Sequence, residues 1–277
     1  MDAPTAAPAS DDAPLSYGSY LALDDLLALQ RPQTAAAGEE HPDELLFIVV
    51  HQASELWFKV VLRELDALRA ALAPPYAEGP AVAAERALWR AGRLNALTRI
   101  VAGQLAALDT LPPQRFLQFR GYLGSSSGSQ SVQFRAIEAA SGLREPHFLQ
   151  VVREHGEVPP LVAAELEQPT LQSLFLALLG AAGVEPEALY TGPGPTTYFL
   201  LAEQLLEYDQ QFARWRFGHV QLVERIIGPM TGGTGGTLGA KYLSRTVSQR
   251  FFPALWEVRG RLYGAARAAA GAAGAPP

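Results

Sequence analysis

Apolar residues recur along most of the chain with the three-to-four-residue spacing of an amphipathic helix, and no segment alternates with the period of a strand. Prolines and glycines, often in pairs or clusters, interrupt this pattern. The spacing predicts helices at roughly 17–31, 42–73, 81–109, 112–121, 130–141, 145–154, 159–167, 170–182, 196–227 and 241–263. We therefore expect an all-α fold, a bundle of long helices.

The helix expected at 42–73 carries a histidine among apolar residues. His51 shares one face with Phe47 and Phe58, and a second apolar stripe follows another face of the same helix. A helix that is apolar around most of its circumference is typically buried, so this one is expected to lie in the core. An imidazole at such a position is either a hydrogen-bonded core residue or part of a site.

A second histidine, His219, lies near the end of the helix expected at 196–227, with Trp215 and Leu222 on its face. Gly218 beside it has no side chain and would let a flat group approach the backbone. The helix is followed by a glycine-rich segment, 228–239 (GPMTGGTGGTLG). Free backbone N–H groups in such a loop suit an anion, although a plain connector between helices has the same composition.

Composition narrows the class of protein. The 277 residues are 48% hydrophobic, enough to bury the core of one large domain or two small ones. The net charge of −6 argues against nucleic acid or an anionic membrane as partner. The absence of cysteine excludes disulfides, thiolate ligands and covalently attached haem.

The two ends of the chain differ in composition from its middle. Residues 1–15 have no basic start and no apolar core, so they are not a secretory signal, and no apolar run approaches the ~20 residues that span a bilayer. We expect a soluble, cytoplasmic protein. Residues 1–15 and 264–277 are expected to be disordered tails, because they are rich in alanine and proline, and residues 16–263 a single domain.

The residues alone leave several roles open for the two histidines. His51 and Glu55 are spaced to share a metal, but the Glu-x-x-His pairs of di-metal bundles and the His-Glu-x-x-His of zinc hydrolases do not occur. A haem is the better hypothesis, with one histidine bound to iron and the other facing the distal side. His219 is the better ligand candidate because of its apolar setting, and the haem would be of the non-covalent b type.

One more segment carries candidate chemistry. Phe116–Arg120 (FLQFR) places Arg120 one helical turn after Phe116 and just before Leu123 and the flexible 124–128 (GSSSG). The guanidinium fork of arginine binds carboxylates through two hydrogen bonds, so Arg120 could hold an acidic substrate. A solvated arginine on a surface helix is an equally good interpretation from the sequence alone.

Taken together, these segments resemble the tryptophan 2,3-dioxygenase family, block by block and in the family's order. The blocks are 17–30 (YGSYLALDDLLALQ), 43–59 (DELLFIVVHQASELWFK), 116–138 (FLQFRGYLGSSSGSQSVQFRAIE), 215–239 (WRFGHVQLVERIIGPMTGGTGGTLG) and the segment 242–259 with FFPALWEVR. The resemblance implies a mostly helical haem enzyme, usually a homotetramer, that acts on L-tryptophan with O2.

The resemblance also implies a role for each matching residue. His219 falls on the proximal iron ligand and His51 on the distal histidine that faces the indole N–H. The substrate-binding positions are Phe47 and Leu123 as pocket walls, Phe116, Arg120 for the carboxylate, Thr234 for the amino-acid head group, and Tyr17, Tyr20 and Leu21 for a neighbouring subunit's pocket.

Four departures from the family pattern concern the substrate. Phe116 stands where tyrosine is common, Ser129 where phenylalanine is expected, and Val50 where glutamine is frequent, and the loop before Thr234 lacks a usual lysine and has one more residue. The resemblance implies dioxygenation to N-formylkynurenine. The departures keep open mono-oxygenation of tryptophan or a substituted tryptophan to an oxindole or hydroxylated product in a natural-product pathway. A haem-binding protein without catalysis is a third, more remote hypothesis.

Overall fold

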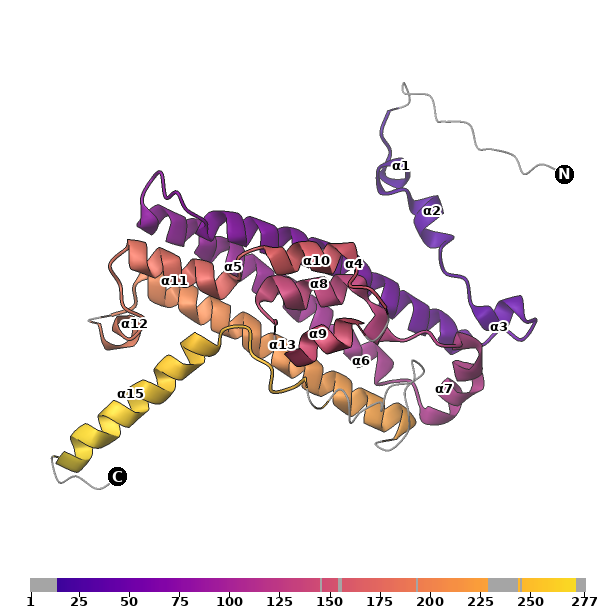
Figure 1. Ribbon diagram of the computed structural model, residues 1–277. Coiled ribbons are helices and arrows are strands. Elements are labelled where there is room, and N and C mark those ends of the chain that lie inside the picture. The colour runs from indigo at the N-terminus through magenta and orange to yellow at the C-terminus, as the bar shows by residue number, and fades with distance from the viewer. Residues whose placement is uncertain are drawn as a thin grey trace.

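The computed structural model describes residues 14–144, 146–153, 156–192, 194–228, 244 and 246–272 (Figure 1). Every regular element in these ranges is a helix, which confirms the all-α fold class. The tail expected at 1–15 lies almost wholly outside the described residues. The α-helices are α1 (Tyr17–Leu21), α2 (Leu23–Leu27), α3 (Gln33–Ala36), α4 (Pro42–Leu72), α5 (Pro80–Gly103), α6 (Leu105–Leu108), α7 (Pro113–Arg120), α8 (Val132–Ser141), α9 (Pro146–Arg153), α10 (Pro160–Glu167), α11 (Leu171–Ala181), α12 (Ala188–Thr191), α13 (Thr197–Ile227) and α15 (Pro253–Ala272), with 3₁₀ turns η1 (Gly121–Leu123) and η2 (Gly128–Gln130).

Three long helices, α4, α5 and α13, form the centre of the bundle, in which α5 packs along both α4 and α13, and α8, α10 and α11 cover one side of them (Figure 1). Their contact is a continuous apolar core in which Leu65, Leu94 and Leu205 are wholly buried. Burying such side chains stabilises the fold by about 1.5–3 kcal/mol each relative to exposing them. The helices that carry His51 and His219, α4 and α13, are therefore both central to the bundle.

The structure divides two helices that the periodicity predicts as continuous. The helix expected at 81–109 breaks at Gln104 into α5 and α6. The helix expected at 17–31 breaks at Ala22, whose positive φ of 47° ends α1, and the short helices α3 and α12 were not predicted. Apolar spacing persists through single-residue breaks, so it cannot reveal them.

The last helix also differs from its prediction at 241–263. Within the described residues it begins only at Pro253, because the backbone N–H groups of Phe251 and Phe252 donate to the buried carboxylate of Asp209 instead of joining a helix. It then continues to Ala272, so part of the stretch expected to be a disordered tail from residue 264 is helical. Alanine has the highest helix propensity, which accounts for the extension.

One face of α4 is not buried. The side chains of Leu45, Val49, Leu56 and Val60 form an exposed apolar stripe, hereafter the α4 stripe, so the expectation of a buried helix is correct for the opposite face only. By length and hydropathy α4 could cross a membrane, so the prediction that no segment could was wrong. A core or interface helix meets the same criteria, and α4 packs against α5, α8 and α11.

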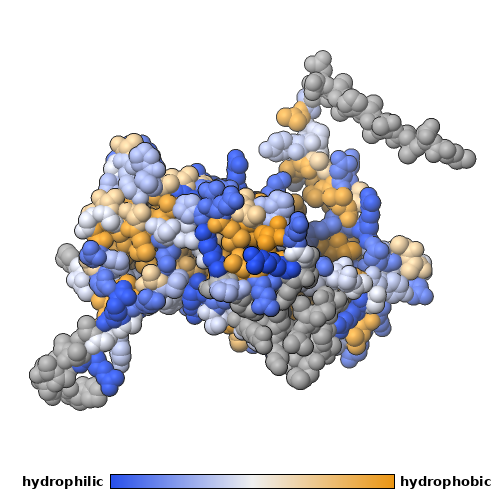
Figure 2. Space-filling view, in the orientation of Figure 1, coloured by the Kyte–Doolittle hydropathy of each residue, from blue (hydrophilic) through white to orange (hydrophobic). Residues whose placement is uncertain are grey.

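The N-terminal segment leaves the bundle on this side. Helices α1 and α2 extend away from the other helices (Figure 1), and exposed apolar residues lie along α2 and the adjoining part of α4 (Figure 2). The segment is attached through Gln30 and Gln52. The Gln30 amide donates to Oε1 of Gln52 at 2.6 Å, and the Gln52 amide donates to the carbonyl of Leu29 at 3.1 Å.

Candidate active site

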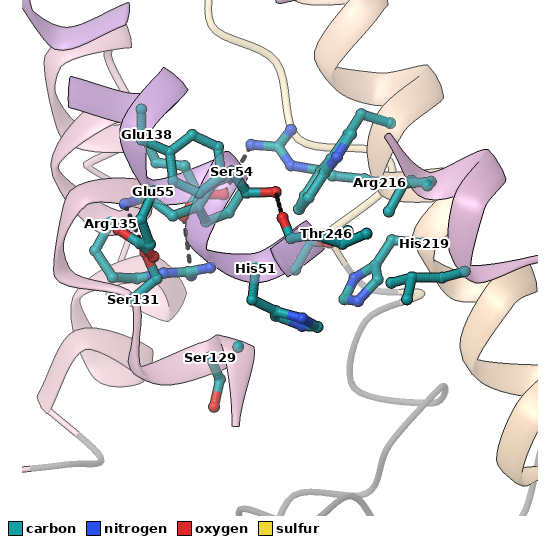
Figure 3. Close-up of a pocket in the computed structure, with 17 residues that line it drawn as sticks. His51, Ser54, Glu55, Ser129, Ser131, Arg135, Glu138, Arg216, His219 and Thr246 are labelled. Carbon is teal, nitrogen blue, oxygen red and sulfur yellow. Dashed lines mark hydrogen bonds and ion pairs between the residues drawn. The ribbon is translucent and has the colours of Figure 1, made fainter. Parts of the chain in front are cut away.

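A cavity of about 130 Å³ lies between α4 and α13 (Figure 3). It is lined by Val50, His51, Ser54, Glu55 and Phe58 of α4, Leu105 and Leu108 of α6, Gly128, Ser129 and Ser131, Phe134, Arg135 and Glu138 of α8, Trp215, Arg216 and His219 of α13, and Thr246. Both predicted histidines therefore face one space.

His51 presents one ring nitrogen to this cavity. Its Nδ1 lies 2.7 Å from the carbonyl oxygen of Phe47, which can only accept, so Nδ1 carries the hydrogen. In the neutral ring, Nε2 is then left with a free lone pair. The side chain is accessible from the cavity, yet burial among protein groups lowers the pKa of His51, and the Phe47 bond and Glu55 offset this only in part. His51 is therefore a neutral hydrogen-bond acceptor at pH 7.

His219 faces His51 from the opposite wall (Figure 3). Burial lowers the pKa of His219 to about 4, and repulsion from His51 and Arg135 adds to the effect. The ring stacks on the indole of Trp215, with centroids 5.3 Å apart and planes 22° from parallel. His219 is thus neutral at pH 7, and neutral imidazole is the form that binds a metal.

The lowered pKa of His219 predicts an acid-sensitive apoprotein. The unfolded chain binds a proton here near pH 6.5 and the native chain near pH 4, so native stability falls as the pH falls through this window. Urea unfolding at pH 7.5 and pH 5 should show a loss that is about 1–2 kcal/mol smaller in His219→Gln than in the wild type. The titration of His51 changes the free energy of unfolding of both proteins alike, so it cancels in the comparison. Equal losses of stability in the two proteins would contradict a lowered pKa of His219 in the native state.

A buried ionic cluster forms another wall of the cavity. The guanidinium of Arg216 donates to Glu138 at 2.9 Å, and that of Arg135 lies 2.9 Å from the other carboxylate oxygen. The Arg216 and Glu138 side chains are almost wholly buried. Two guanidiniums share one carboxylate, and in the described part of the chain the Nε atoms of both arginines have no hydrogen-bond partner. The wall therefore carries net positive charge.

These residues fit a haem. A haem requires a nitrogen ligand for iron, apolar contacts for a flat ring and cationic partners for its carboxylates. The cavity walls offer two neutral imidazoles and the apolar side chains of Phe58, Leu105 and Phe134. They also contain the unpartnered Nε–H groups of Arg135 and Arg216, hereafter the arginine wall. The described ranges contain no group of three or more histidine or acidic side chains that could hold a bare metal ion.

Comparison with known proteins identifies the family. A family model described as "Tryptophan 2,3-dioxygenase" matches residues 1–192 and 188–262. The chain belongs to the tryptophan 2,3-dioxygenase family.

Curated relatives within this family resemble the chain over nearly its full length. A protein named "Tryptophan 2,3-dioxygenase" from Nocardioides sp. is 39% identical and covers 90% of this chain and 96% of its own. A protein of the same name from Anaeromyxobacter dehalogenans is 39% identical, and the match covers 92% of this chain and 99% of that protein. A third, from Bacillus cereus, is 34% identical, and the match covers 90% of this chain and 93% of that protein. The similarity therefore extends over more than nine-tenths of each of these relatives.

Three of the substrate positions implied by the tryptophan 2,3-dioxygenase family cluster beside His51. Phe47 lies 4.2 Å from the His51 ring and 5.7 Å from Phe116, measured between centroids. Phe116 and Leu123 belong to the same apolar cluster, which shares Val50 with the cavity wall. Phe116 is buried against Phe119 in an edge-to-face contact, so an aromatic ring without a hydroxyl fits there.

None of the remaining predicted residues that the structure describes lines the cavity. Arg120 is half-buried at the end of α7 and is not among the described lining residues, and Thr234 lies outside the described residues. Tyr17, Tyr20 and Leu21 are exposed on α1, away from the bundle. Gly218 is not among the lining residues. It lies against α6, because a Cβ at this position would meet Cδ1 of Leu105 at 3.7 Å.

Val50 is one departure from the family pattern that lines the cavity, and Ser129 is another. Its hydroxyl lies 2.9 Å from that of Ser127, and it lines the wall beside Gly128 and Ser131 (Figure 3). Three small residues in sequence proximity leave this wall less filled than a phenylalanine at 129 would. The site is therefore shaped differently from the pattern that the family implies.

Proposed function

We propose that this chain is a haem-dependent oxygenase that uses O2 to open the C2–C3 bond of L-tryptophan and gives N-formylkynurenine. One observation supports this most strongly. Two neutral imidazoles face one cavity in a chain whose curated relatives, named tryptophan 2,3-dioxygenase, match nine-tenths of its length.

His219 would hold the iron of a b-type haem. Its pKa keeps the lone pair free at neutral pH, and its ring is already oriented by Trp215. The chain has no cysteine to attach the macrocycle covalently. The unpartnered N–H groups of Arg135 and Arg216 suit the carboxylates of the cofactor. When bound, the haem supplies the redox chemistry with O2, which no protein side chain here can provide.

The other residues would hold and orient the substrate. Nε2 of His51 would accept the indole N–H, since Nδ1 is engaged with the Phe47 carbonyl. The apolar cluster of Phe47, Phe116 and Leu123 would exclude water from one side of the indole. Arg120 would bind the carboxylate through two hydrogen bonds, and Thr234 would hold the amino-acid head group. Positioning of this kind can supply several kcal/mol of a barrier reduction.

Two reactions are distinguished by the fate of the oxygen atoms. In dioxygenation, both atoms of O2 enter the product as the C2–C3 bond breaks, and no external reductant is consumed. In mono-oxygenation, one atom enters the product and the other leaves as water, with two electrons and two protons from a reductant. The second reaction is the alternative function, and the small wall at Ser129 leaves room there for a substituent on the tryptophan.

Mass spectrometry of the products formed from L-tryptophan under ¹⁸O₂ tests the proposal. Two labelled oxygen atoms are expected in N-formylkynurenine. One labelled atom, formed only with an added reductant, would replace the proposal with mono-oxygenation. Haem binding without turnover of tryptophan or substituted tryptophans would favour the non-catalytic haem-binding protein.

We also propose a soluble, cytoplasmic homotetramer, with neither nucleic acid nor a membrane as partner. The α4 stripe leaves a large apolar surface open on the single chain, which is typical of a subunit interface. The N-terminal segment extends from the same side, with Tyr17 and Tyr20 exposed by about three-quarters. In the tetramer, these residues and Leu21 would complete the pocket of a neighbouring subunit.

Charge on the α4 stripe should prevent assembly. Leu56→Glu combined with Val60→Glu places two carboxylates where an apolar partner surface would lie, so multi-angle light scattering should show a mass well below that of the tetramer. Leu161→Glu, at an exposed leucine of α10 outside the stripe, serves as the control and should keep the wild-type mass. A tetramer in the double variant would place the interface elsewhere.

A further inference from the structure

We propose that Trp215 is a positioning residue that fixes the plane of the His219 imidazole and thereby sets the strength of its bond to iron. This inference rests on the proposed haem ligand. Trp215 precedes His219 by one helical turn on α13, so the two side chains share a face.

The ring contact restrains the one angle that the helix leaves free. On a helix the first side-chain torsion of a histidine is confined to few rotamers, whereas the torsion that turns the ring is broad. The His219 ring lies 22° from parallel to the indole at a centroid distance of 5.3 Å. Turning the imidazole by a quarter turn would end this stacking, so the indole selects one plane for the ligand.

Trp215 is itself held in place. Its indole lies 4.8 Å from the ring of Phe134 on α8, and Phe134 is buried against Phe58 of α4 at 5.5 Å. The rings therefore form a continuous chain from α4 through α8 to α13. The orientation of His219 is tied to the packing of the main core and not to a loop.

The opposite histidine is oriented in a different way. His51 is fixed by its hydrogen bond to the Phe47 carbonyl, the kind of partner that commonly orients metal-binding histidines. Within the described ranges, no hydrogen bond to the His219 ring is present, and the stack with Trp215 is its specific contact. The aromatic stack therefore takes the place that a hydrogen-bonded partner usually has.

Resonance Raman spectroscopy of the ferrous, haem-loaded protein tests this role, because the iron–histidine stretching band reports the ligand bond directly. Trp215→Met and Trp215→Leu remove the flat ring and should shift and broaden the band and speed haem loss up to roughly tenfold. Trp215→Phe keeps a flat ring and should restore the band. A merely structural role would lower the melting temperature without moving the band.

The matched control is Trp256→Leu. Trp256 also packs on the main core, where its indole donates to Asp209 at 2.8 Å, but it does not line the cavity. Its loss should lower stability and leave the band in place. An unchanged band in either folded Trp215 variant, or the same shift in Trp256→Leu, would overturn the inference. Absence of the band from the wild-type holoprotein would instead overturn the assignment of His219 as ligand.

Discussion

We expect His219→Ala to purify without the Soret band of a haem protein, and His51→Ala to keep that band. Losing even a partner that orients a metal ligand commonly costs 10- to 100-fold in affinity, so loss of the ligand itself should weaken haem binding by roughly a hundredfold or more. His51 is expected to act on the substrate, so its loss should lower turnover and leave the cofactor bound. Absorbance titration of each apoprotein with haem measures the difference.

Two comparisons make this prediction specific. Adding imidazole to His219→Ala should restore a Soret band, because the free ligand can occupy the space that the side chain leaves on α13. His41→Ala is the matched histidine control, since His41 caps α4 outside the cavity and should bind haem normally. Retention of the band in His219→Ala together with its loss in His51→Ala would reverse the roles of the two histidines.

Arg120→Leu should weaken binding of L-tryptophan by roughly 30-fold or more. A carboxylate that loses its charged, hydrogen-bonded partner commonly costs about 2–5 kcal/mol, and about 1.4 kcal/mol is tenfold in affinity. Tryptamine, which lacks the carboxylate, should bind the wild type and Arg120→Leu equally. Spectral titration of the ferric holoprotein with both ligands isolates the contact between the guanidinium and the carboxylate.

Arg115→Leu is the control for this prediction. Arg115 lies on the same helix, α7, but its guanidinium is paired with Asp43 at the start of α4. Its loss should leave the affinity for tryptophan unchanged. If Arg120→Leu bound tryptophan as tightly as the wild type, the carboxylate would have to be held by another group.

The long helices could be predicted from the sequence, because a sustained apolar face specifies both the element and the side that packs. Boundaries set by single residues could not. The break at Gln104 and the left-handed turn at Ala22 leave the apolar spacing intact. The late start of α15 depends on Asp209, a residue more than 40 positions earlier whose carboxylate accepts two backbone N–H groups. Only tertiary structure shows this contact.

The site could be predicted where chemistry is visible in one helix. His51 and His219 stand out because an imidazole among apolar residues needs a reason, and the structure brings both to one cavity. The arginine wall was missed, since Glu138 and Arg216 come together from different helices. An arginine and a glutamate three residues apart in the apolar VQFRAIEAAS of α8 were the available signal. The role of Arg120 stays a prediction.

The origin of the cavity walls has a consequence for the amount of protein in a cell. His51 and His219 are far apart in the sequence, and they face one cavity because α4 and α13 both pack against α5 and α6. The unfolded chain therefore offers no assembled site, and the proposed haem would bind the native state alone. By mass action, a cofactor at a hundred times its dissociation constant adds about 2.7 kcal/mol of stability. Haem supply would then set how much of the chain survives proteolysis, before any substrate is present.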